Sequence, residues 1–176
     1  MNFRDILPAT VHRVPKSLCR SMIKMKRLRY KIIYSCYDHN DKWSEVAIST
    51  RLGEFWGNAQ LNPEDEEYES RFTGCEIAEA RAYVKYLSEE IKIAKVKYET
   101  LKNLEKNFLS STEPTVKNSE SFYRVVKRIQ KNAAAAYNEL QDLKERKRFT
   151  EDAIKTIPTI RASRHKEILK RVNKTK

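Results

Sequence analysis

The chain has 176 residues, a net charge of +12, a sequence pI of about 9.6 and only three glycines. With 34% charged and 40% hydrophobic residues, the composition favours long helices over an all-β fold. Every apolar run is shorter than the roughly 20 residues that span a bilayer, and a secretory signal is lacking, so no membrane partner is expected.

The cysteines and histidines are too scattered along the chain to predict a metal site or a disulfide framework. They are Cys19, Cys36, Cys75, His12, His39 and His165. An odd number of cysteines without paired spacing is typical of a reducing compartment, which predicts a cytosolic location. No metal and no cofactor are expected.

Residues 1–27 are a basic N-terminal arm, in which Asp5 is the single acidic residue among many lysines and arginines. We interpret this arm, with the start of the next segment, as a nucleic-acid-binding region. Its candidate contacts are Arg20, Lys24, Lys26, Arg27, Arg29 and Lys31. A membrane-surface helix, a solvated tail and a mitochondrial presequence are the alternatives, and the last would place the protein in mitochondria.

Residues 28–72 predict a small three-stranded antiparallel meander and a turn. A β-branched and aromatic run covers 30–37, alternation covers 43–50, and a third strand covers 55–61. Such a sheet is marginal alone, so one face is expected to pack on a helix near Ile77, Ala80 and Leu143.

The aromatic residues of this sheet have two interpretations. On an exposed face they would serve as base-stacking platforms, and otherwise they pack in the core or at an edge. They are Tyr30, Tyr34, Tyr37, Trp43, Phe55 and Trp56.

The acidic run 64–69 follows Asn62-Pro63 and is typical of the start of a short helix, although paired carboxylates also suit a metal or acid–base site. Next, Thr73 and Glu76 have the spacing of a capping box, which predicts a helix start there, with a break at Gly74.

Residues 73–157 predict an antiparallel helical hairpin of coiled-coil type, because two heptad seams follow each other. The first seam is Ile77, Ala80, Val84, Leu87, Ile91, Ala94, Tyr98, Leu101, Glu105 and Phe108. The second is Phe122, Val126, Ile129, Ala133, Ala136, Leu140, Leu143, Lys147, Thr150, Ile154 and Ile157.

The two seams mirror each other about a turn near residues 113–114. This register pairs Leu101 with Val126 and Tyr98 with Ile129. The alanine run 133–136 is interpreted either as tight hairpin packing or as a docking groove for a third helix.

Residues 158–176 form a basic C-terminal segment, because Pro158 is expected to end the second helix. This segment predicts either a short helix or a tail that is disordered until bound. Its candidate nucleic-acid contacts are Arg161, Arg164, Lys166, Lys170 and Arg171.

Residues 55–82 carry an aromatic-Gly-x-Ala strand end, a Pro-x-Asp-Glu turn and Gly-x-x-Ile-Ala-x-x-Arg-Ala. This pattern resembles small accessory proteins of phages and mobile elements of Gram-positive bacteria. The resemblance implies a bacterial cytoplasmic setting and a role in phage or plasmid biology, which includes inhibition of host defence complexes. It assigns no site residue.

Taken together, the sequence predicts a mainly helical α+β protein that binds nucleic acid or a nucleoprotein complex without catalysis and largely without sequence preference. No glycine-rich phosphate loop, HExxH motif or nucleophile elbow indicates an enzyme. The alternatives are a protein-interaction module that inhibits or modulates a host enzyme complex, such as a defence nuclease, and an organellar ribosomal or assembly protein.

Overall fold

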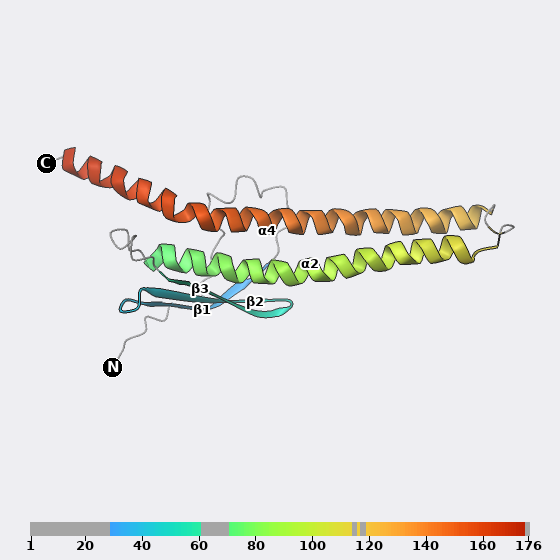
Figure 1. Ribbon diagram of the computed structural model, residues 1–176, viewed down its shortest axis with the longest axis horizontal. Helices are drawn as coiled ribbons and strands as arrows, with labels where there is room; N and C mark the ends of the chain where they lie inside the picture. The colour runs from blue at the N-terminus through green and yellow to red at the C-terminus, as the bar shows by residue number, and fades with distance from the viewer. Residues whose placement is uncertain (1–28, 61–70, 114–115, 117–118, 175–176) are drawn as a thin grey trace. The chain divides into compact units, whose positions relative to one another are not determined.

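The computed structural model describes residues 29–60, 71–113, 116 and 119–174, with residues 158–174 described by their backbone alone. The elements in chain order are β1 (Lys31–Asp38), β2 (Trp43–Thr50), β3 (Gly53–Gln60), α2 (Arg71–Ser111) and α4 (Glu120–Lys174) (Figure 1). A three-stranded antiparallel sheet followed by two long helices confirms the predicted α+β class. In the described ranges, no helix is long and apolar enough to cross a membrane.

Two compact units divide the chain. One contains the described residues up to Tyr86 together with α4 from Lys147 onward, and the other contains the hairpin from Leu87 to Arg146. Each helix therefore contributes to both units, and the units are considered separately below.

The sheet is the predicted meander in the order β1-β2-β3. At the first turn the Asp38 carboxylate accepts the backbone N–H of Asn40 at 2.8 Å, and Lys42 adopts a positive φ of 49°. At the second turn Gly53 has a φ of 115°, which a residue without Cβ adopts at little cost. Because both turns are specified locally, the three strands appear close to their predicted bounds.

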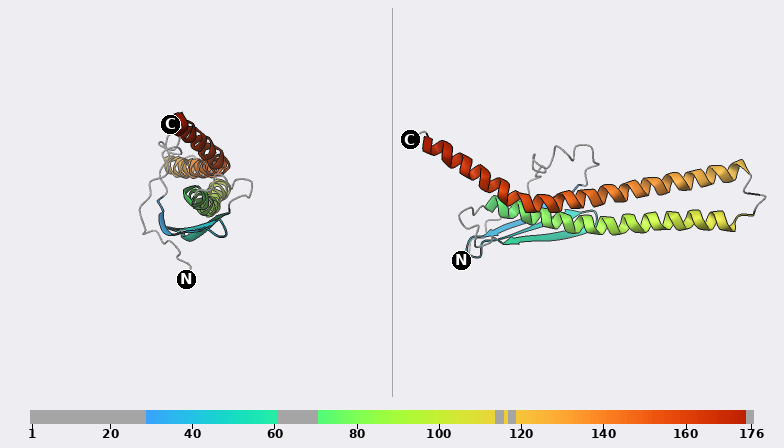
Figure 2. Two further views of the ribbon diagram at one scale, coloured as in Figure 1. Left: turned by 90° about the vertical axis from the view of Figure 1, so that its left-hand side faces the viewer. Right: turned by 45° about the horizontal axis from the view of Figure 1, so that its top comes forward.

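One face of the sheet packs on the N-terminal half of α2 (Figure 2). Ser44, Val46 and Ile48 alternate along β2 on this face and are all almost fully buried. The packing prediction was right about the helix but wrong about its side. The backbone of Gly57 lies against Ala78 and Ala82, whereas the sheet was expected to pack near Ile77 and Ala80. Since α2 is apolar on two sides, the sequence alone left the choice of side open. The sheet packs on the side whose small residues permit the closest approach.

The predicted start of this helix was also wrong, because α2 begins at Arg71 and runs through Thr73 and Gly74. Thr73 is therefore inside the helix and is not its cap. A Cβ on Gly74 would lie 2.1 Å from the hydroxyl oxygen of Ser44, so the glycine allows the helix to approach β2. Gly74 was interpreted from the sequence as a helix break, but the close packing of α2 on β2 explains why a glycine stands there.

The outer edge of β3 is covered by two cations from α2. The Arg81 guanidinium donates to the carbonyl of Asn58 at 2.7 Å, and the Lys85 ammonium donates to the carbonyl of Trp56 at 2.6 Å. Since an exposed strand edge invites pairing with another chain, these two side chains protect β3 from edge-to-edge association.

We predict that Gly57→Ala destabilises the protein by about 1–3 kcal/mol, the usual cost of overpacking. The new Cβ would lie 2.0 Å from the carbonyl oxygen of Ala78 and 2.5 Å from the amide nitrogen of Ala82, and backbone atoms cannot swing aside. Urea unfolding measures the change. Asn58→Ala, exposed on the next residue of β3, is the control and should change the stability by less than about 0.5 kcal/mol.

In the second unit, α2 and α4 run antiparallel side by side (Figure 1). Every predicted seam position within this unit is buried or half-buried, whereas most positions between them are exposed. The most deeply buried are Leu87, Ala94, Ala133, Ala136 and Leu140. The heptad seams are therefore confirmed as the hairpin contact.

The predicted register of the hairpin is wrong by about one heptad. The ring of Tyr98 contacts that of Tyr137 at 5.5 Å between centroids, eight positions beyond the expected Ile129. Likewise, the Gln130 amide donates to the Glu105 carboxylate at 2.9 Å. Nearer the turn the offset is smaller, because the Phe108 ring stacks on that of Phe122, three positions beyond the residue that the mirrored seams place opposite it. Because a heptad seam repeats every seven residues, sliding one helix by a heptad keeps the same faces buried.

The ends of the helices account for this shift. The first helix extends to Ser111, three residues beyond the last predicted seam position. The second begins after Ser119, whose hydroxyl accepts the N–H of Phe122 at 3.2 Å and so caps the helix. A longer first helix moves the turn toward the C-terminus and moves the facing residues with it.

Pro158 does not end α4, contrary to prediction, since the helix continues to Lys174. Proline removes one backbone hydrogen bond and commonly kinks a helix without stopping it. Figure 1 shows the ribbon of α4 changing direction in its red C-terminal part, as a kink of this kind would produce.

We predict that a double-mutant cycle with Tyr98→Ala and Tyr137→Ala gives a coupling energy of about 1 kcal/mol, the usual value for an aromatic pair. The same cycle with Tyr98→Ala and Ile129→Ala should give a value near zero, because these side chains lie at different levels. Chemical denaturation of the wild type, the three single variants and the two double variants measures both coupling energies. A larger coupling with Ile129 would show that the register of the mirrored seams is correct.

Candidate functional site

The candidate nucleic-acid contacts of the N-terminal region have only two members in the described residues. Arg29 and Lys31 are exposed at the start of β1. The others lie outside the described residues and are Arg20, Lys24, Lys26 and Arg27. The acidic run 64–69 also lies outside them, and the described ranges hold no group of carboxylates, cysteines and histidines fit for a metal.

The candidate contacts of the C-terminal segment all fall on the last part of α4, whose backbone is helical through Lys174. The 3.6-residue repeat arranges the basic positions in two rows on different sides of the helix. We call them the arginine row (Arg161, Arg164 and Arg171) and the lysine row (Lys166, Lys170 and Lys174). The arginine row, together with Ile168, continues the spacing of the hairpin seam beyond Ile157.

Half of the aromatic residues of the sheet belong to the core. Tyr30 lies against Tyr83 and donates to the Glu79 carboxylate at 2.6 Å, while Tyr37 is buried and Phe55 contacts Tyr86. Burial, and then the Glu79 carboxylate, raise the pKa of the Tyr30 hydroxyl above its usual value. The packing interpretation therefore holds on the side that faces α2.

The outer face of the sheet carries an aromatic pair. Tyr34 and Trp56 lie on either side of Ala47 in the strand register, and their ring centroids are 5.4 Å apart. Ala47 is fully buried, whereas Trp56 is 44% exposed. Trp43 is half-buried, as Tyr34 is, so Trp56 is the most exposed member of the predicted stacking platform.

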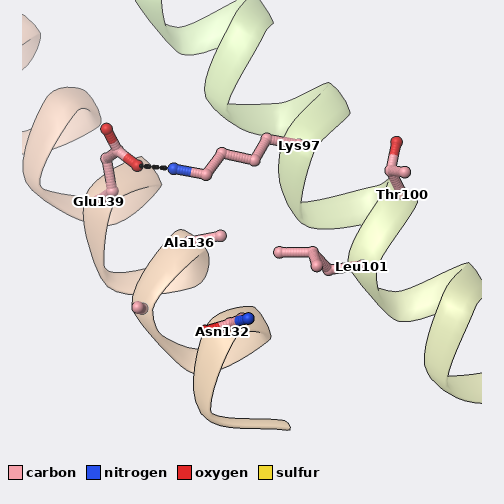
Figure 3. Close-up of a pocket in the computed structure, with 7 residues that line it drawn as sticks. Lys97, Thr100, Leu101, Asn132, Ala136 and Glu139 are labelled. Atoms are coloured by element: carbon pink, nitrogen blue, oxygen red, sulfur yellow. Dashed lines mark hydrogen bonds and ion pairs between the residues drawn. The ribbon is translucent and has the colours of Figure 1, made fainter. Parts of the chain in front are cut away.

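A groove of about 480 Å³ lies between the helices of the hairpin unit (Figure 3). Its apolar lining comes from Leu101 and Ala136, which point toward each other, and from Ala135. On its rim the Lys97 ammonium pairs with the Glu139 carboxylate at 2.7 Å. Thr100 and Asn132 complete the lining.

This groove suits an apolar side chain of another helix better than a charged ligand. Its two rim charges neutralise each other, and an exposed pair of this kind contributes little net attraction. A docking groove was one of the two interpretations of the alanine run 133–136, and tight hairpin packing was the other. Lys97 and Glu139 had no signal in the sequence, because only the slipped register brings them together.

A scan of protein-family models, a search of curated proteins and a search of solved structures each returned no match to this chain.

We predict that Ala136→Leu destabilises the hairpin by about 1–3 kcal/mol, because this alanine is almost fully buried and the larger side chain overpacks the contact. Ala135→Leu, on the exposed wall of the groove, should stay within about 0.5 kcal/mol of wild type. Thermal melts followed by circular dichroism give the comparison. Equal losses at the two positions would contradict the open groove.

Proposed function

We propose that the protein binds nucleic acid or a nucleoprotein complex without catalysis and largely without sequence preference. The observation that supports this proposal is the helical C-terminal end of α4, because the positions of both basic rows fall on one continuous stretch of helix. From residue 158 to 174 the chain has six basic residues and one acidic residue. A helix presents such cations at fixed spacing, so the ordering cost of a flexible tail is avoided.

The physical basis of binding would be the release of condensed counterions from the phosphate backbone. Lysine and arginine contact phosphates and carry no base information by themselves, so affinity would depend on salt more than on sequence. The hairpin between Leu87 and Arg146 is a weaker candidate for phosphate contacts, because its twelve basic residues are offset by nine acidic ones.

We predict that replacing either basic row by alanine weakens binding to duplex and single strands alike and flattens the salt dependence. Losing three phosphate contacts would reduce the slope of log affinity on log salt by up to about 2.7 for duplex DNA, at roughly 0.9 per contact. Fluorescence anisotropy over a salt series measures affinity and slope together.

The matched control removes the same charge from the hairpin, where Lys127, Arg128 and Lys131 are exposed on α4. This triple alanine variant should retain most of the affinity and the slope. If it weakens binding as much as the row variants do, net charge alone governs binding and the assignment to the C-terminal rows is wrong. Absence of binding to any nucleic acid at low salt would reject the proposed function itself.

A second candidate is a protein-interaction module that docks a helix of a host enzyme complex on the hairpin. The groove favours it, as does an exposed apolar stripe on α2 formed by Ile93, Val96 and Leu104. Ala135→Leu narrows the groove and should abolish capture of a partner from nuclease-treated lysate while leaving nucleic-acid affinity unchanged. The resemblance of residues 55–82 to phage and mobile-element accessory proteins remains a prediction that is compatible with either candidate.

A further inference from the structure

The sheet unit carries two cations, Arg81 and Lys85, beside an exposed tryptophan. We call this group the Trp56 cluster, and it consists of Trp56, Tyr34, Arg81 and Lys85. Arg81 and Lys85 are one helical turn apart on α2, and both are exposed. Their described contacts are the two β3 carbonyls, and neither pairs with a carboxylate among the described residues.

Protection of the β3 edge does not use all the hydrogen-bonding capacity of Arg81 and Lys85. Each contact with a carbonyl uses part of the donor capacity, since an ammonium has three N–H groups and a guanidinium has five. The carbonyls hold the cationic heads at the edge of β3 while further N–H groups remain available to a ligand. The positive charge is therefore positioned in advance, next to the residue whose ring is exposed.

The aromatic ring of the cluster is also held in place by its neighbours. The ring of Trp56 packs on that of Tyr34 at a centroid distance of 5.4 Å with an interplanar angle of 44°. Ala47, which is fully buried, lies between the two residues in the strand register. The exposed ring of Trp56 beside fixed cations matches an unstacked base and its phosphate, since every base has a π-face.

We propose that the Trp56 cluster is a site for single-stranded nucleic acid, in which a base stacks on Trp56 and the adjoining phosphates contact Lys85 and Arg81. This inference rests on the proposed function and adds a preference that the basic rows cannot supply. Phosphate contacts alone treat duplexes and single strands similarly, whereas stacking on a side chain requires a base that is not already stacked in a helix.

The test compares an oligothymidylate with a duplex of the same length, using the full chain. Trp56→Leu should weaken binding of the single strand by roughly 10- to 100-fold, the range expected for losing one stacked base. It should leave duplex affinity nearly unchanged. Trp56→Phe, which keeps an aromatic face, should restore most of the lost affinity. Tyr123→Leu removes an aromatic side chain of the hairpin that is 60% exposed, against 44% for Trp56, and as the control it should have no effect.

A direct readout comes from Trp43→Phe, which leaves Trp56 as the single tryptophan of the chain. Its fluorescence should be quenched by the oligothymidylate and much less by the duplex. The double variant Arg81→Ala/Lys85→Ala should reduce the salt slope for the single strand by about 1.4, at roughly 0.7 per contact.

The two proposals fail in different ways. If no nucleic acid binds at low salt, the proposed function is rejected together with this site. If the single strand binds through the basic rows, while Trp56→Leu has no effect and the tryptophan emission does not change, only the Trp56 cluster is rejected, and its cations serve solely to protect the edge of β3.

Discussion

The close approach of the β3 backbone to α2 at Gly57 is the contact on which the sheet unit depends. A three-stranded sheet has too little apolar area to be stable alone, and in the described residues α2 supplies its cover. The backbones of β3 and α2 are in direct contact at this point, since a Cβ on Gly57 would overlap the main chain at Ala78 and Ala82. The same proximity lets Arg81 and Lys85 reach the carbonyls of β3, so a packing requirement also positions the cations of the Trp56 cluster.

Sequence periodicity predicted which residues of the hairpin are buried but not which residues face each other. Burial depends on the phase of each helix separately, and the seam through Leu87, Ala94 and Leu140 fixes that phase. Pairing depends on the level at which the helices meet, and every heptad slip offers an equivalent apolar match. Specific contacts decide among these alternatives, here the Tyr98–Tyr137 and Gln130–Glu105 pairs, and neither has a signature that can be recognised along the chain.

Local signals failed where tertiary structure provides the reason for a residue. Gly74 has the sequence character of a helix break, yet its role is to admit Ser44, a contact across 30 positions of sequence. Pro158 has the character of a stop, yet α4 continues past it. In the candidate sites, clusters of like charge such as the C-terminal rows were recognisable from sequence alone. Arg81 and Lys85 were not, because their importance comes from the strand edge beside them.

The distribution of charge differs between the two proposed nucleic-acid sites. From residue 147 onward the chain has ten basic and three acidic residues, which favours any phosphate backbone through counterion release. Residues 29–60 of the sheet have four of each, so the general field there is weak and a ligand would have to be held by specific contacts. Arg81 and Lys85 provide a local exception to that balance, beside an exposed ring. The C-terminal rows would therefore set how strongly a polyanion binds, and the Trp56 cluster would set whether a single strand is preferred to a duplex.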